Sequence, residues 1–302
     1  MKLGVLLVHG IGIQGPDWAE GIIRGLRDAV AQELAHETTL QNPPSVDDMV
    51  AIEPAYWEGI LRVREERLRS LLEAGERANA GAIGQGIWRQ LWHWFRRKEY
   101  AFIADYLCDI IGYLHPETQK IIQEELSRAL SRLISQSPTQ NEPVCLTVVS
   151  HSLGTVIASD YIWDTAKAKA RQNQWLLENL FTVGSPLALF SLKFGGPEEF
   201  KKPIRVETEH GRWINIYDPD DPVGMPLHAL NEAYAQSVHE DVAVDAGPYL
   251  LSHAHYFARS STLRIIGRKL ALDWLRLNRQ LNQQEMALRY AAYDEWVKTI
   301  DG

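Results

Sequence analysis

The sequence predicts an α/β protein, with a mostly parallel β-sheet flanked by helices and one helical insertion. Short apolar runs of strand length alternate with amphipathic stretches of helix length, which is the order found in parallel sheets. Two of these runs end in glycine-containing turns, HGIG and SHSLG. The 302 residues, of which 45% are hydrophobic and 23% charged, are enough for one large domain or two small ones.

The first three elements are a strand, a helix and a strand. Residues 3–8 (LGVLLV) form a continuous apolar run, which is typical of a strand buried on both faces. Asp17 is a candidate cap for a helix that extends to about Ala35, because its apolar residues keep helical spacing. Two prolines then break the chain, and residues 49–57 are predicted to form the second strand. We assign residues 1–57 to the core.

Residues 58–115 interrupt the alternation with two long helical stretches, the second of which contains IWRQLWHWF followed by RRK. Two interpretations stay open. The insertion is either a packed helical hairpin or a cap over the site. As a cap, it would use Trp88 and Trp92, with Trp94, to line an apolar acyl groove, because tryptophan combines a large apolar face with one donor. The neighbouring basic residues would hold an anionic head group; they are Arg89, Arg96, Arg97 and Lys98.

The alternation resumes in residues 116–275, which complete the core. Helices are predicted at 117–135 and 153–169, and strands at 143–149, 180–184, 212–217 and 240–245. The chain from about residue 257 to residue 296 is amphipathic and helical, and we assign residues 276–302 to a C-terminal extension.

Ser152 lies in Ser150-His151-Ser152-Leu153-Gly154, between a β-branched strand and a helix. This is the context of a nucleophile elbow, a tight turn that presents a serine hydroxyl at the carboxyl end of a strand. The turn needs small neighbours. Gly154 meets that need, and Ser150 stands where a glycine is usual. An ordinary helix N-cap is the plainer interpretation of Ser152.

A serine hydroxyl is inert until a base takes its proton, so a nucleophile needs a histidine and an acid. The candidate acids are Asp218, Asp220 and Asp221 in YDPDDPV, and the candidate bases are His253 and His255 in SHAHYF, which we expect to be extended. The oxyanion needs two backbone N–H donors. We assign these to Leu153, after the nucleophile, and to Ile11 in the HGIG turn, where His9 serves to stabilise the turn.

These segments occur in the order of an α/β-hydrolase, which the chain resembles through VLLVHGIG, VVSHSLG, FTVGSPL, YDPDDPV and SHAHYF. Its core is also similar, more weakly, to the lipase core of intracellular DDHD-type phospholipases. The resemblance implies Asp221 as the acid, since Asp-Pro-Val is the usual form of the acid turn. It implies His253 as the base, since His-x-x-Tyr recurs there. The chain begins at what would be the third strand of that fold.

We therefore expect a serine carboxylic ester hydrolase acting through an acyl-enzyme. Acyl transfer on the same triad and a catalytically idle scaffold that binds a partner are the alternatives. Neither the DPDD turn nor His253-Ala254-His255 completes a recognisable metal-binding pattern, so no metal and no cofactor are expected.

Charge and cysteine content indicate the setting. The formal charge of −8 disfavours nucleic acid as a partner and leaves a small acyl ester or lipid as the substrate, with transient contact with a lipid surface left open. Cys108 and Cys145 show no metal spacing, and no apolar stretch has the length of a membrane span. A cytoplasmic location is expected. Acyl length, head group and oligomeric state are left open.

Overall fold

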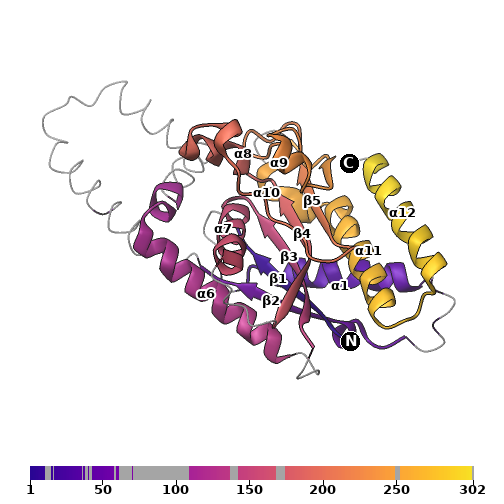
Figure 1. Ribbon diagram of the computed structural model, residues 1–302. Helices are drawn as coiled ribbons and strands as arrows, with labels where there is room; N and C mark the ends of the chain where they lie inside the picture. The colour runs from indigo at the N-terminus through magenta and orange to yellow at the C-terminus, as the bar shows by residue number, and fades with distance from the viewer. Residues whose placement is uncertain are drawn as a thin grey trace, which may run out of the picture.

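A computed structural model supplies the structure of the chain. It describes residues 1–10, 15, 17–35, 37, 40, 43–57, 59–60, 70, 109–136, 142–167, 174–248 and 252–300. Within these ranges the strands form one parallel sheet of six strands in the order β2-β1-β3-β4-β5-β6 (Figure 1). The strands are β1 (Leu3–Val8), β2 (Val50–Ala55), β3 (Val144–His151), β4 (Trp175–Val183), β5 (Arg212–Tyr217) and β6 (Glu240–Ala243). The predicted α/β class with a parallel sheet is confirmed.

Helices cover both faces of the sheet (Figure 1). One face carries α1 (Glu20–Ala35), α11 (Ser260–Leu277) and α12 (Gln283–Thr299), and the other carries α6 (Pro116–Ser135) and α7 (Leu153–Lys167). Shorter helices lie in the connections. They are α2 (Val46–Met49), α8 (Leu187–Phe190), α9 (Glu232–Ala235) and α10 (Ser252–His255), with 3₁₀ turns at Ser191–Phe194, Pro197–Glu199 and Tyr256–Ala258.

The apolar run of β1 is divided between two cores. Leu3, Val5 and Leu7 belong to the core on the α1 face, while Leu6 and Val8 belong to the core on the α6 and α7 face. This follows from the two-residue period of a strand, which sends successive side chains to opposite faces. A strand between two helical layers therefore needs apolar residues at every position.

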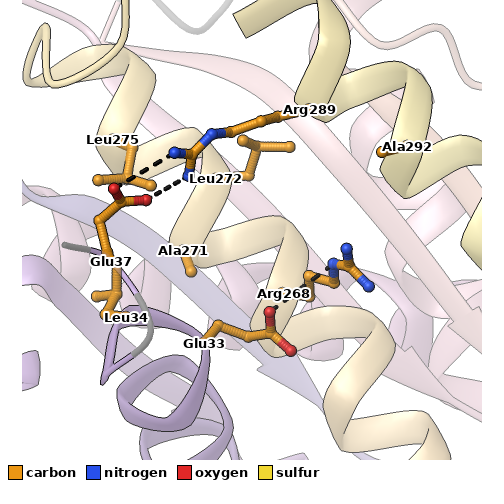
Figure 2. Close-up of a pocket in the computed structure, with 9 residues that line it drawn as sticks. All are labelled: Glu33, Leu34, Glu37, Arg268, Ala271, Leu272, Leu275, Arg289 and Ala292. Carbon is orange, nitrogen blue, oxygen red and sulfur yellow. Dashed lines mark hydrogen bonds and ion pairs between the residues drawn. The ribbon is translucent and has the colours of Figure 1, made fainter. Parts of the chain in front are cut away.

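Ion pairs and close packing hold the helices of the α1 face together. Arg289 of α12 pairs with Glu37, just beyond α1, and Arg268 of α11 lies 3.7 Å from Glu33 of α1. Figure 2 shows both pairs bordering a cavity of about 170 Å³ whose floor is apolar. The helices approach closely here, because a Cβ on Gly267 would lie 2.4 Å from the Cβ of Ala29.

Polar groups are also buried between α11 and β4. Asp273 accepts hydrogen bonds from Lys269 Nζ at 2.5 Å, from the Tyr290 hydroxyl at 2.7 Å and from Asn179 at 2.7 Å. Lys269 and Asp273 are both fully buried. Lys269 and Asp273 pair with each other, so the network links the sheet to two helices without an unpaired charge at this position in the core.

Several element boundaries differ from the prediction. β4 begins at Trp175 and not at residue 180, and the helical C-terminal region is divided into α11 and α12. The SHAH segment, expected to be extended, is the helix α10. Most of the predicted insertion lies outside the described residues, and the division into core, insertion and extension stays a prediction.

Candidate active site

The order of the strands places a crevice between β1 and β3. These two strands are neighbours, but the chain leaves β1 toward α1 on one face and leaves β3 toward α7 on the other. At such a switch point the loops diverge, and open α/β sheets bind ligands there, beyond the carboxyl ends of the strands. His9 and Gly10 follow β1 at this point, and Ser152 follows β3.

Ser152 has a strained backbone conformation. Its φ of 52° lies in the left-handed region, which non-glycine residues rarely adopt. The turn is held by hydrogen bonds, since Ser152 N donates to Val183 O at 2.9 Å and Ser152 O accepts from Thr155 N at 2.9 Å. The surroundings are tight: a Cβ on Gly154 would lie 2.3 Å from His9 O, and one on Gly10 would lie 2.5 Å from Ser152 Cβ. Ser152 therefore lies in a tight, strained turn between β3 and α7.

Three predicted site residues come together in one hydrogen-bonded chain. The Ser152 hydroxyl donates to His253 Nε2 at 2.7 Å, and His253 Nδ1–H donates to Asp221 Oδ2 at 2.8 Å. All three side chains are buried. They come from the ends of β3, β5 and the segment after β6, so only the folded sheet brings them into contact. The donor assignment on the ring follows from the carboxylate, which can only accept.

The carboxylate of Asp221 is held by several donors. Its Oδ1 accepts from Val223 N at 2.9 Å, and its Oδ2 accepts from the Tyr256 hydroxyl at 2.8 Å as well as from His253. Burial alone would raise the pKa of Asp221, but the hydrogen bonds and the nearby imidazole outweigh burial and hold that pKa below its ordinary value. Asp221 is therefore ionised at neutral pH.

The other two candidate acids do not reach the histidine. Asp218 accepts from Asp220 N at 2.8 Å and from Ala246 N at 2.7 Å, so it fixes the loop, and Asp220 is exposed. His255 lies on the same short helix as His253, and the Ser152 hydroxyl is bonded to His253.

Tyr256 and His151 are contacts of the triad that our sequence reasoning did not assign. The Tyr256 hydroxyl accepts from Asp218 N at 2.8 Å while donating to Asp221, so one buried phenol joins two aspartates of the acid loop. His151 Nε2–H donates to the backbone carbonyl of His253 at 2.7 Å. Burial and the neighbouring His253 lower the pKa of His151 to about 3, which keeps the ring neutral. The SHSLG and HAHYF motifs contain both residues but do not reveal their partners.

His9 stabilises the turn after β1, in agreement with the sequence interpretation. Its Nδ1–H donates to Gly10 O at 2.7 Å, its Nε2 accepts from Trp57 N at 3.1 Å, and its ring stacks on the Trp57 indole at 4.6 Å. Burial lowers the pKa of His9 to about 4. Both ring nitrogens are occupied, so His9 is neutral and structural.

The predicted oxyanion donors are described in part. Leu153 begins α7 directly after Ser152, where the first backbone N–H groups of a helix have no partner within the helix. Ile11 lies outside the described residues, as do Trp88, Trp92, Trp94 and Cys108. Cys145 is a free, buried thiol.

In the described part of the chain, no group of three or more His, Cys, Asp or Glu side chains is arranged to hold a metal ion. Among the same residues, no helix is both long enough and apolar enough to cross a membrane.

Comparison with known proteins gives one distant relative. No family model matches the chain. Over 141 residues, 42% of its length, the chain is 29% identical to a probable mitochondrial phospholipase of Saccharomyces cerevisiae. The match covers 19% of that protein, so the chain aligns with about a fifth of its relative's length.

Proposed function

We propose that the protein is a serine hydrolase of the α/β-hydrolase type that cleaves carboxylic esters of lipids through an acyl-enzyme. The observation that carries this proposal is the hydrogen-bonded chain from Ser152 through His253 to Asp221, with distances of 2.7 and 2.8 Å. The similarity to a probable phospholipase supports a lipid ester as the substrate class. The triad order along the chain, Ser, Asp, His, is that of α/β-hydrolases.

The geometry accounts for each step of the proposed reaction. Ser152 Oγ attacks the ester carbonyl carbon while its proton passes to His253 Nε2. The ionised Asp221 stabilises the resulting imidazolium, and the Leu153 N–H, with Ile11 N–H as the second proposed donor, stabilises the oxyanion. His253 then gives its proton to the leaving alkoxide, which departs as the alcohol. Water, deprotonated by His253, attacks the acyl-enzyme; the bond from the acyl carbon to Ser152 Oγ breaks, Oγ takes the proton back from His253, and the acid leaves.

The strained elbow favours catalysis over a purely structural role for Ser152. A plain N-cap has extended backbone angles, whereas Ser152 has a φ of 52° and directs its hydroxyl to a histidine. Backbone strain of this kind costs roughly 1–3 kcal/mol and persists where the surrounding structure enforces it, commonly at functional sites. An idle scaffold gives no reason to keep both the strain and the bonded triad.

Ser152→Ala tests the proposal. We expect kcat for a soluble ester to fall on the order of 10⁴-fold or more, because triad members act as a unit, and the thermal midpoint to stay near that of the wild type. A fluorophosphonate probe should label the wild type and not the variant. Absence of labelling in the folded wild type would favour the idle scaffold.

Acyl transfer remains the alternative on the same residues. It replaces water by an alcohol in the second half of the reaction, so product analysis with and without added alcohol separates the two. The acyl groove predicted from the sequence at Trp88 and Trp92 is a separate hypothesis for where the acyl chain binds, and it has its own test. Trp88→Ala and Trp92→Ala should reduce hydrolysis of long-chain esters selectively if these residues line the groove.

A further inference from the structure

A cavity of about 240 Å³ lies beside the triad, on the face of the sheet that α1 covers. Gly10 and His253 are part of its wall, and both contact Ser152. His253 Nε2 accepts from the Ser152 hydroxyl at 2.7 Å, and Gly10 packs so closely that an added Cβ would lie 2.5 Å from Ser152 Cβ. Only a wall residue, Gly10 or His253, therefore separates a substrate bonded to Ser152 Oγ from the cavity.

The described part of the cavity wall combines apolar side chains with three histidines, His9, His151 and His253. Leu7 and Val149 line it from the sheet, Ile22 from α1, and Phe257 from the segment after α10. Within the described part of the chain, no Asp, Glu, Lys or Arg side chain contributes to this wall. Two of these histidines are neutral at neutral pH, because burial lowers the pKa of His9 to about 4 and that of His151 to about 3.

The size of the cavity limits what can enter. Sites for drug-sized ligands span about 300–1,000 Å³, and this cavity is below that range, so it cannot enclose a whole two-chain lipid. A charged head group is disfavoured because no Asp, Glu, Lys or Arg side chain lines the described part of the wall. One unbranched hydrocarbon chain fits both the size and the chemistry.

We propose that this cavity receives the acyl chain of the ester whose carbonyl Ser152 attacks. The inference rests on the proposed function and assigns the acyl side of the substrate to the α1 face. It makes Ile22 a specificity-determining residue, because its side chain occupies the wall between the cavity and α1. A larger side chain at this position should shorten the acceptable acyl chain without touching the triad.

The experiment compares two neighbouring isoleucines of α1 in the full chain. Both Ile22 and Ile23 are half-buried and pack against the same core, but only Ile22 lines the cavity. For Ile22→Trp we expect kcat/KM on p-nitrophenyl octanoate to fall about tenfold or more, and on p-nitrophenyl acetate to stay within about twofold. Ile23→Trp should leave the ratio of the two esters unchanged. Thermal unfolding checks that each variant folds, and Ile22→Phe replaces Ile22→Trp if it does not.

The outcomes separate this inference from the function itself. Equal loss on both esters in the folded Ile22 variants, or the same selective loss in Ile23→Trp, overturns the cavity as the acyl site while the ester hydrolase stands. A wild type that hydrolyses neither ester and takes no fluorophosphonate label at Ser152 overturns the proposed function, and the acyl site with it.

Discussion

Asp221 differs from its two neighbouring aspartates in what its carboxylate contacts. It accepts from His253 and Tyr256 on one oxygen and from Val223 N on the other. Asp218 accepts instead from Asp220 N in its own loop and from Ala246 N in the segment after β6. The three acids therefore differ: Asp221 contacts the histidine, Asp218 stabilises the loop, and Asp220 is exposed to solvent. Chain position alone does not distinguish them.

Substitution by asparagine should separate these roles. In Asp221→Asn, we expect kcat to fall by about 10³- to 10⁴-fold, because the amide cannot orient the imidazole or stabilise its charge. Asp218→Asn should retain far more activity but lower the thermal midpoint, since an NH₂ group replaces one of two acceptors. Asp220→Asn is the exposed control. Steady-state kinetics and thermal unfolding of the three variants rank them, and the opposite ranking would move the acid to another residue.

In the proposed reaction, Tyr256 is a positioning residue that acts through its hydrogen bond to Asp221. Its burial, together with the nearby Asp221 charge, raises the pKa of the phenol, so the hydroxyl stays protonated and keeps donating. For Tyr256→Phe we expect kcat to fall roughly tenfold with KM little changed, because the carboxylate loses one buried donor. His255→Phe is the matched control, because His255 is the neighbouring residue and makes no hydrogen bond to Ser152, His253 or Asp221 in the described part of the chain. Unchanged kcat in folded Tyr256→Phe would make the tyrosine purely structural.

Motif reasoning identified the residues that meet at Ser152, but not the residues that support them. Ser152, Asp221 and His253 follow strand ends in sequence patterns that can be read locally. Tyr256 contacts Asp221, and His151 contacts the backbone of His253. More than thirty residues of chain separate the partners in each pair, so only the fold brings them together. The second oxyanion donor and the acyl groove stay predictions.

At the scale of elements, the site depends on the close approach of the β1 loop to the start of α7. A Cβ on Gly154 would lie 2.3 Å from His9 O and 2.7 Å from Val8 O, and both are backbone atoms that cannot move aside alone. The glycine is therefore required by packing between two elements. Ser150, in contrast, fits where a glycine is usual, because its hydroxyl donates to Phe181 O at 3.1 Å.

Gly154→Ala should separate β1 from α7. We expect a loss of about 3 kcal/mol or more in the free energy of unfolding, together with a loss of activity, as for other substitutions that overpack a core. Gly21→Ala is the matched control, because nothing lies within 4 Å of the added Cβ in α1, and helix propensity there favours alanine by about 0.5–1 kcal/mol. Urea unfolding of both variants measures the difference. Equal stability of the two would contradict the packing argument.

Two strands match the prediction at both ends, and buried polar residues explain why a third does not. β1 and β5 begin and end as expected. β4 begins earlier than predicted because Glu178 and Asn179 are buried within it, bonded to Arg276 and Asp273. Polar residues in a strand look like a loop when their partners, here on α11, are nearly a hundred residues away.

At the scale of the whole molecule, two helical layers enclose a sheet whose carboxyl edge carries neutral, buried histidines. His9 is 2% exposed, and both of its ring nitrogens are bonded, so the native state has no room for a second ring proton. Its pKa is lowered from 6.5 to about 4. Stability and the geometry of the β1 turn are therefore linked to pH through the same residue.

The sign of this linkage is fixed by which state binds the proton. Between about pH 6.5 and pH 4 the unfolded chain protonates His9 and the native chain does not, so the free energy of unfolding falls as pH is lowered. The lowered pKa of Asp221 acts in the same direction. The ionised Asp221 stabilises the fold above the ordinary carboxyl pKa, and this contribution to the free energy of unfolding is lost as pH falls through the lowered pKa. Acid should therefore destabilise the fold before any carboxylate of ordinary pKa is protonated.

His9→Gln should reduce this acid sensitivity. The amide can still accept from Trp57 N and donate to Gly10 O but does not titrate, so the variant loses some stability at neutral pH and gains a flatter pH dependence. For the wild type we expect His9 to contribute about 2 kcal/mol to the loss of unfolding free energy between about pH 7 and pH 5. Urea unfolding at both pH values measures it. A wild type and a variant whose unfolding free energies fall in parallel would show that His9 titrates normally in the folded protein.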